Sequence, residues 1–188
     1  MSIIKFNNQN VSILIKKDLR WQTISFDGGK VFFRGEKDFI IKIFEQFKKN
    51  KYDLKKIKKL LLQLNSCSSA IFFNKKYCIC FTDLCRSYPI FFNLNSNSVL
   101  FSNSSERFKK QYNIDQESLN YIKLCGYSLG YGTILKNIKI MKPGEIFYSD
   151  NKNLKLAKYF EYHVTTKKNK LSKKKIKNKI IFYSRQYN

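Results

Sequence analysis

Five cysteines and one histidine are the side chains in this sequence best suited to nucleophilic or metal chemistry: Cys67, Cys78, Cys80, Cys85, Cys125 and His163. Zinc sites use closely spaced Cys and His ligands, whereas His163 lies far from the cysteines in the sequence. Cys78 and Cys80 are two residues apart in an apolar segment, so they face the same side of a strand. This pattern favours buried free thiols over a metal site. The odd cysteine count, with no signal peptide and no long apolar run, predicts a cytoplasmic protein without membrane insertion.

The second group of candidates lies in FTDLCRSYPIFF, which holds Asp83, Arg86 and Pro89. Proline cannot donate a hydrogen bond to a sheet. We therefore expect one strand to end near Asp83, a bend through 85–87, and a new strand from Ile90. Asp83 and Arg86 are spaced to pair across this bend. Their types and positions indicate residues that shape the fold, and we assign them no catalytic role.

The elements that must position these residues follow from periodicity. Strands are predicted in SIIKF and VSILIKK, hairpins in RWQTISFDGGKVFFRGE and SSAIFFNKKYCICFTD, and a further strand pair on either side of the turn NLNSNS. Helical periodicity begins at Lys37 and again over 53–64, where Asp53 is an N-cap candidate. A short helix in SSERFKKQY and a helix from about Asp115 to Gly126 follow. Two short strands around KPGE and a last strand in LKLAKYFEY complete the order, which predicts an α+β layered domain.

The net charge is +24, which by itself would suggest nucleic acid or an anionic membrane as a partner. The 37 basic residues include five arginines, so 32 are lysines. Proteins that read bases and phosphates rely on the bidentate guanidinium of arginine. Lys, Asn, Ile, Phe and Tyr can all be encoded by codons made of A and T, so a biased genome explains the charge more simply. A nucleic-acid partner is the less favoured interpretation.

Four segments resemble, in order, the N-terminal class II glutamine amidotransferase domain of asparagine synthetases. They are FTDLCRSYPIFF with Asp83, Arg86 and Pro89; VLFSNSSERF with Ser102; GTILKNIKIMKPGEIF with Thr133, Pro143, Gly144 and Glu145; and KYFEY with Tyr159. The resemblance covers residues ~70 to 162 well and the N-terminal third loosely. It implies a layered α/β/β/α sandwich of the N-terminal-nucleophile hydrolase type with antiparallel sheets. It also implies that the Asp83 segment joins the two sheets and that Pro-Gly-Glu closes a hairpin.

The resemblance implies a catalytic position as well. Class II amidotransferases use an N-terminal cysteine, exposed by removal of Met1, as nucleophile and base; Ser2 occupies that position here. The family's arginine clamp, oxyanion-hole stretch and Gly-Asp motif have no match in this sequence. Without an oxyanion donor and a clamp, most of the rate enhancement is lost. We therefore expect no glutaminase activity and assign no catalytic residue.

The family's second domain is an ATP-pyrophosphatase, and its glycine-rich loop does not occur before Asn188. ATP and Mg²⁺ would belong to that domain, so no cofactor is expected in this chain. We predict an amidotransferase-like domain over 1–164. The lysine-rich 165–188 is then the stub of a linker, or the start of a missing synthetase domain in a truncated chain.

Three functional hypotheses follow. The first is the amidotransferase-like domain of an asparagine synthase (glutamine-hydrolysing)-like ligase, which transfers an amide to a carboxylate using ATP, with neither activity present in this chain alone. Its partners would be a synthetase domain, in cis or in trans, or a second copy in a homodimer. The second hypothesis is a non-catalytic interaction scaffold with Trp21, Tyr127 and Tyr131 as contact residues. The third is a basic protein whose lysines and aromatic rings bind nucleic acid.

Overall fold

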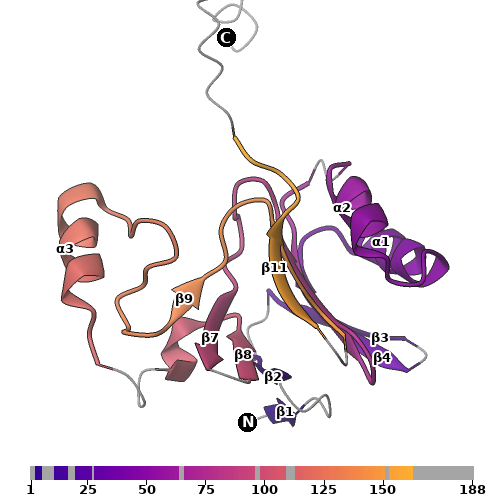
Figure 1. Ribbon diagram of the computed structural model, residues 1–188, viewed down its shortest axis with the longest axis horizontal. Helices are drawn as coiled ribbons and strands as arrows, with labels where there is room; N and C mark the ends of the chain where they lie inside the picture. Colours follow the sequence, from indigo (N-terminus) through magenta and orange to yellow (C-terminus); the bar gives the residue numbers. More distant parts are fainter. Residues whose placement is uncertain are drawn as a thin grey trace, which may run out of the picture.

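The computed structural model describes residues 3–5, 11–16, 20–26, 28–63, 66–95, 98–108, 113–150 and 153–162. They form two sheets, one of six strands in the order β11-β10-β6-β5-β4-β3 and one of five in the order β1-β2-β8-β7-β9. From right to left, Figure 1 shows α1 and α2, the six-stranded sheet, the five-stranded sheet and α3. The predicted α+β class, with antiparallel-rich sheets in a layered sandwich, is confirmed.

The six-stranded sheet is antiparallel throughout and is built largely from hairpins. Its strands are β3 (Gln22–Phe26), β4 (Gly29–Arg34), β5 (Ser69–Asn74), β6 (Cys78–Thr82), β10 (Glu145–Ser149) and β11 (Leu154–Lys158). The hairpins β3–β4 and β5–β6 are those predicted from the sequence. Every residue of the central strand β6 is buried, because helices cover one face of the sheet and the second sheet covers the other.

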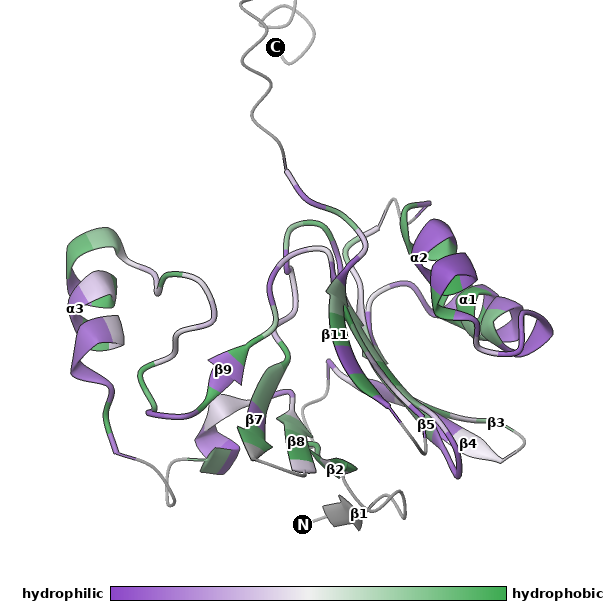
Figure 2. Ribbon diagram, viewed as in Figure 1, coloured by the Kyte–Doolittle hydropathy of each residue, from purple (hydrophilic) through white to green (hydrophobic). Residues whose placement is uncertain are grey.

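Helices α1 (Lys37–Lys49) and α2 (Leu54–Leu61) cover the outer face of the six-stranded sheet. The apolar positions at helical spacing are the buried ones: Ile40, Ile43, Phe44 and Phe47 in α1, and Ile57 and Leu61 in α2. As predicted, Asp53 caps α2, and its side chain accepts a hydrogen bond from Lys56 N at 2.9 Å. In Figure 2 the green stripes of both helices alternate with purple ones, as expected for helices with one buried face.

The five-stranded sheet combines the N-terminal strands with the segment after Pro89. Its strands are β1 (Ile3–Lys5), β2 (Val11–Leu14), β7 (Phe91–Asn95), β8 (Ser98–Ser102) and β9 (Lys139–Ile140). Strand β2 runs parallel to β8, and the other paired strands are antiparallel. A core of Val11, Ile13, Phe92, Phe101, Phe147 and their neighbours fills the space between the two sheets.

The expectation that Pro-Gly-Glu closes a hairpin is wrong. Strand β9, before the turn, pairs with β7 of the five-stranded sheet, while β10, after it, pairs with β6 and β11 of the other sheet. The turn is therefore a crossover between sheets. Two short strands around a tight turn give the same local sequence pattern in either arrangement, so the pattern alone could not distinguish them.

Helix α3 (Gln116–Cys125) begins and ends as its sequence predicts. The side chain of Asp115 accepts a hydrogen bond from Ser118 N, and Gly126 ends the helix with φ 79°. The short helix predicted before it is the 3₁₀ turn η1 (Ser105–Phe108). Ser118 is the only buried residue of α3, so this helix contributes little to the core. No helix in the described ranges is long and apolar enough to cross a membrane.

Candidate functional site

Asp83 follows β6 and organises the bend that leads into the other sheet. Its carboxylate accepts backbone hydrogen bonds from Ser68 N at 2.8 Å, Cys85 N at 2.8 Å and Ser87 N at 3.1 Å. The side chain is 3% exposed, and these donors replace the water that a buried carboxylate loses. As expected, this segment joins the two sheets, since β6 and β7 belong to different ones.

The expected pairing of Asp83 with Arg86 is wrong. The described ion pairs do not include these two residues. Backbone donors occupy the carboxylate instead, and Arg86 N donates to the main-chain oxygen of Asp83 at 3.2 Å. Arg86 has φ 54°, a left-handed conformation that the tight bend imposes.

Gly144 and Tyr159 meet the Asp83 bend. Gly144 N donates to Asp83 O at 3.0 Å, and Gly144 O accepts from Tyr159 N at 2.8 Å. The phenol of Tyr159 donates to Thr82 O at 2.6 Å. Gly144 has φ +67°, and a Cβ there would lie 2.8 Å from Phe160 O, so only glycine fits without strain. We call Asp83, Gly144 and Tyr159 the junction.

Glu145 lies next to the junction and is 1% exposed. Its carboxylate accepts hydrogen bonds from Lys142 N at 2.7 Å and from the Tyr131 phenol. The Lys142 ammonium stands 4.0 Å from the centre of the Tyr131 ring. Burial, and next the Glu145 carboxylate, raise the pKa of Tyr131, so at neutral pH this phenol is a neutral donor. The contacts of Glu145 hold the crossover turn closed.

The other motif residues do not converge with the junction. Thr133 Oγ1 contacts Leu135 O and Ile138 O within its own loop, and Ser102 Oγ accepts from Ser104 N at 3.2 Å. Pro89 precedes Ile90, whose carbonyl accepts from Met141 N at 2.9 Å. The contacts of Thr133 and Ser102 shape local turns, and the bond to Ile90 joins the start of β7 to the end of β9.

A pocket of about 300 Å³ opens beside the junction. It is lined by Ser66, Cys67, Asp83, Leu84, Cys85, Ser87 and Tyr162. Cys67 and Cys85 are exposed, so the expectation of buried thiols is wrong for them, as it is for Cys125. A neighbouring base or cation makes a thiol reactive, and the described residues of this lining include no His, Lys or Arg. Sequence reasoning missed the pocket because Cys67 and Cys85 are in separate connections.

The other two cysteines behave as expected. Cys78 and Cys80 are buried on one side of β6, with their sulfur atoms 4.0 Å apart. Burial, and next its contact with Cys78, raise the pKa of the Cys80 thiol. Within the described ranges, no cluster of three or more His, Cys, Asp or Glu side chains could hold a metal ion.

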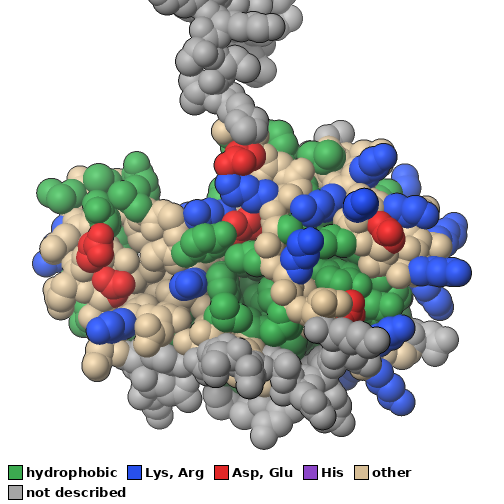
Figure 3. All heavy atoms as spheres, viewed as in Figure 1, with side chains coloured by type: hydrophobic (Ala, Val, Ile, Leu, Met, Phe, Trp, Pro, Cys, Tyr) green, Lys and Arg blue, Asp and Glu red, His purple; other side chains and the backbone are tan. Residues whose placement is uncertain are grey.

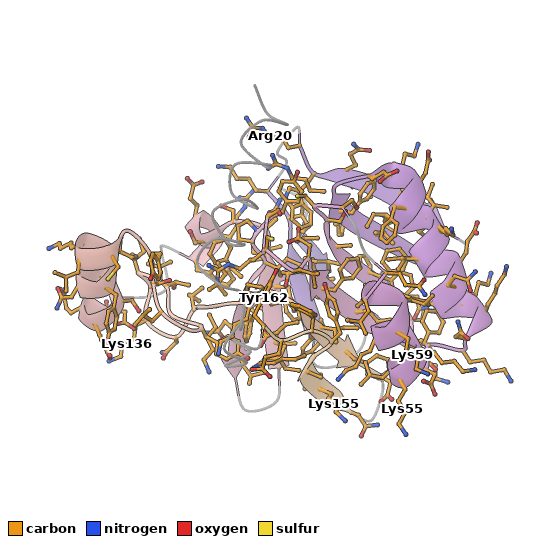
Figure 4. The ribbon with its side chains drawn as sticks, turned by 90° about the horizontal axis from the view of Figure 1, so that it is seen from above. Arg20, Lys55, Lys59, Lys136, Lys155 and Tyr162 are labelled. Carbon is orange, nitrogen blue, oxygen red and sulfur yellow. The ribbon has the colours of Figure 1, made fainter. Side chains whose placement is uncertain are left out.

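The remaining candidates do not form one site. Ser2, His163 and 165–188 lie outside the described residues. Trp21 and Tyr131 pack against the core between the sheets, whereas Tyr127 is 60% exposed. Figure 4 shows the labelled basic side chains spread over the molecule, with Lys136 on the side of α3 and Lys55, Lys59 and Lys155 on the other.

Comparison with known proteins gives structural likeness only. No known protein family matches the chain, and no curated protein matches it. A glutamine phosphoribosylpyrophosphate amidotransferase from B. subtilis, complexed with ADP and GMP, is similar with a TM-score of 0.41 and 11% identity, over 73% of this chain and 31% of that one. A structure described as the allosteric regulatory enzyme of purine biosynthesis is similar with a TM-score of 0.38 and 11% identity, over 75% and 31%. The chain thus covers about a third of either structure.

Proposed function

We propose that this chain is an amidotransferase-like domain of an asparagine-synthetase-like ligase, without glutaminase chemistry of its own. In this proposal its role is to support a synthetase domain, in cis or in trans, which would bind ATP and Mg²⁺ and transfer an amide to a carboxylate. The resemblance of the four sequence segments to that family motivates the assignment.

The observation that carries the non-catalytic role is that hydrogen bonds within the chain occupy the polar groups of the motif residues at and beside the junction. The Asp83 carboxylate accepts three backbone donors, and the Gly144 carbonyl accepts two. The buried Glu145 carboxylate is occupied by Lys142 N and the Tyr131 phenol. Groups held in this way connect the sheets, which supports a structural role for the motif residues.

A surface suited to a partner lies on the end of α3 and the loop that follows it. Leu124 is 82% exposed, Tyr127 60% and Leu129 48%, and we call these three residues the α3 patch. In Figure 3 hydrophobic side chains gather over the upper end of α3. Exposed apolar clusters of this kind mark interaction sites, and we propose the synthetase domain as the partner of the α3 patch.

Glutamine hydrolysis by the purified full chain, compared with the variant Ser2→Ala, tests the proposal. We expect no release of ammonia above the buffer rate from either protein. Hydrolysis that the Ser2→Ala variant loses would mean that Ser2 is a working nucleophile, and the non-catalytic role would be wrong. Circular dichroism of both proteins would verify that they are equally folded.

A further inference from the structure

A second cavity, which shares no lining residue with the junction, lies between α1 and the outer face of the six-stranded sheet. Its volume is about 230 Å³, and it is lined by Phe26, Phe44, Glu45, Lys48, Tyr52 and Phe72. We call it the aromatic pocket. An apolar cavity of roughly 150 Å³ holds benzene, so this pocket is large enough for one aromatic ring with a short side chain.

The wall of the aromatic pocket is a series of contacting rings. The rings of Phe44 and Phe72 stack at 4.9 Å, and those of Tyr52 and Phe72 stack at 5.6 Å with planes 17° apart. Phe26 meets Phe44 at 6.2 Å. Planar guests bind well to such walls, because aromatic pairs are stabilised by offset-stacked and edge-to-face contacts.

Two residues of opposite charge, Glu45 and Lys48, also line the aromatic pocket. Glu45 and Lys48 are exposed residues of α1, three positions apart, and therefore on neighbouring parts of the helix surface. The ion pairs of the described residues do not join them to each other. A carboxylate and an ammonium group that line the same pocket complement a ligand that carries both charges.

Tyr52 contributes a polar group to the pocket lining, and it lies in a turn with a left-handed backbone. Its oxygen accepts a hydrogen bond from Asn74 Nδ2 at 3.4 Å, and burial, the largest effect, raises the pKa of its phenol. The ring is placed by a turn in which Lys51 and Tyr52 have φ 51° and 57°. The turn is closed by hydrogen bonds from Lys51 N to Lys48 O and from Tyr52 N to Phe47 O, as in a Schellman motif. This ordinary helix ending fixes the position of the Tyr52 ring at the end of α1.

We infer that the aromatic pocket binds a zwitterionic amino acid with a single aromatic ring. The ring lies against Phe26 and Tyr52, the half-buried rings of the lining, above the buried Phe44 and Phe72. Glu45 holds the α-ammonium group, and Lys48 holds the α-carboxylate. This site is independent of the proposed function, since it shares no residue with the junction or the α3 patch.

The test is an NMR titration of the full chain with L-phenylalanine, with phenethylamine and 3-phenylpropanoate as analogues that lack one charge. We expect L-phenylalanine to bind with a dissociation constant on the order of millimolar, as its size implies. Each analogue lacks one ion pair with an exposed side chain and should therefore bind about fivefold more weakly. Glu45→Gln and Lys48→Met should each weaken L-phenylalanine binding by a similar factor. The matched control is Lys59→Met, an exposed lysine of α2 outside the pocket lining, which should change nothing.

Three results would overturn the inference. They are absence of L-phenylalanine binding to the folded wild-type chain, equal affinity for all three probes, and equal weakening by Lys48→Met and Lys59→Met. Glu45 and Lys48 are surface residues, so their variants should keep the fold, which the wild-type-like dispersion of the spectra would verify. Glutamine hydrolysis is measured separately, so failure of either proposal leaves the other intact.

Discussion

The junction and α3 differ in how their polar and apolar groups are used. At the junction, polar groups are buried and hydrogen-bonded, and they connect segments far apart in the sequence, such as Thr82 and Tyr159. On α3, apolar groups face outward, and only Ser118 is buried. The first region is built for stability, and the second has surface available for a partner. Substitutions at the junction should therefore lower stability, whereas substitutions in the α3 patch should weaken association and leave stability nearly unchanged.

The largest effect on stability is expected from Asp83→Ala. It leaves the backbone donors of Ser68, Cys85 and Ser87 without their acceptor. Stranding one buried and two partly buried backbone donors should lower the free energy of unfolding by about 3–5 kcal/mol. Urea denaturation followed by circular dichroism would measure this. A loss below about 1 kcal/mol would show that the bend does not depend on Asp83.

Gly144→Ala should cause the second-largest loss in the free energy of unfolding. The added Cβ would lie 2.8 Å from Phe160 O, on a backbone with φ +67°. Left-handed strain costs about 1–3 kcal/mol, and the crowded carbonyl adds to it. Gly126→Ala is a matched control, because Gly126 has a similar φ of +79° and no heavy atom within 4 Å of its Cβ position. Equal losses at the two positions would contradict a role of close packing at the junction.

Tyr159→Phe should have a smaller effect that depends on pH. Removal of the phenol that donates to Thr82 O should cost about 1 kcal/mol at neutral pH. Burial, and next the Asp83 charge, raise the pKa of Tyr159, and burial likewise raises the pKa of Tyr148 to about 12. A tyrosine whose pKa is raised by folding stabilises the protein fully below its unfolded value of about 10, and this contribution is lost as pH rises further.

The free energy of unfolding should therefore fall between pH 10 and 12 in the wild type. It should fall less steeply in Tyr159→Phe, where one of the shifted groups is gone. Denaturation curves at a series of pH values would give both slopes. Identical slopes would show that Tyr159 does not contribute to the alkaline loss of stability.

The smallest effect on stability is expected from Leu124→Lys in the α3 patch. Exposed positions usually change stability by less than about 0.5 kcal/mol, and Leu124 is 82% exposed. Under the proposed function, the same change places a charge in an apolar contact and should weaken binding to the synthetase domain at least tenfold, measured by calorimetry with that purified domain. Lys136→Ala, an exposed change on the same side of the molecule, is the control. Unchanged affinity in Leu124→Lys would exclude the α3 patch as the interface.

Most elements could be predicted from the sequence, because their signals are local. Asp53, Asp115 and Gly126 mark helix ends through short-range hydrogen bonds and a left-handed φ. The crossover at Gly144 could not be distinguished from a hairpin, since strand partners depend on distant segments. The parallel pairing of β2 with β8 could not be predicted from local patterns for the same reason.

The site was harder to predict than the fold. The identity of Asp83 as an organising residue followed from the bend around Pro89. The hydrogen-bond partners of Asp83 could not be predicted, because Ser68 N is a main-chain donor and any residue type except proline can supply such a donor. The aromatic pocket was missed because Phe44 and Phe72 have the pattern of ordinary core residues, and only the fold brings Tyr52 and the charges of α1 beside them.

The proposed function requires that Ser2 of this chain has no glutaminase chemistry. Its most direct test is incubation of the full chain with an electrophilic glutamine analogue such as 6-diazo-5-oxo-L-norleucine, followed by intact mass and sequencing of the N-terminal peptide. The account predicts an unchanged mass, with no adduct on Ser2. An adduct of one analogue per chain located on Ser2, and absent from Ser2→Ala, would contradict it.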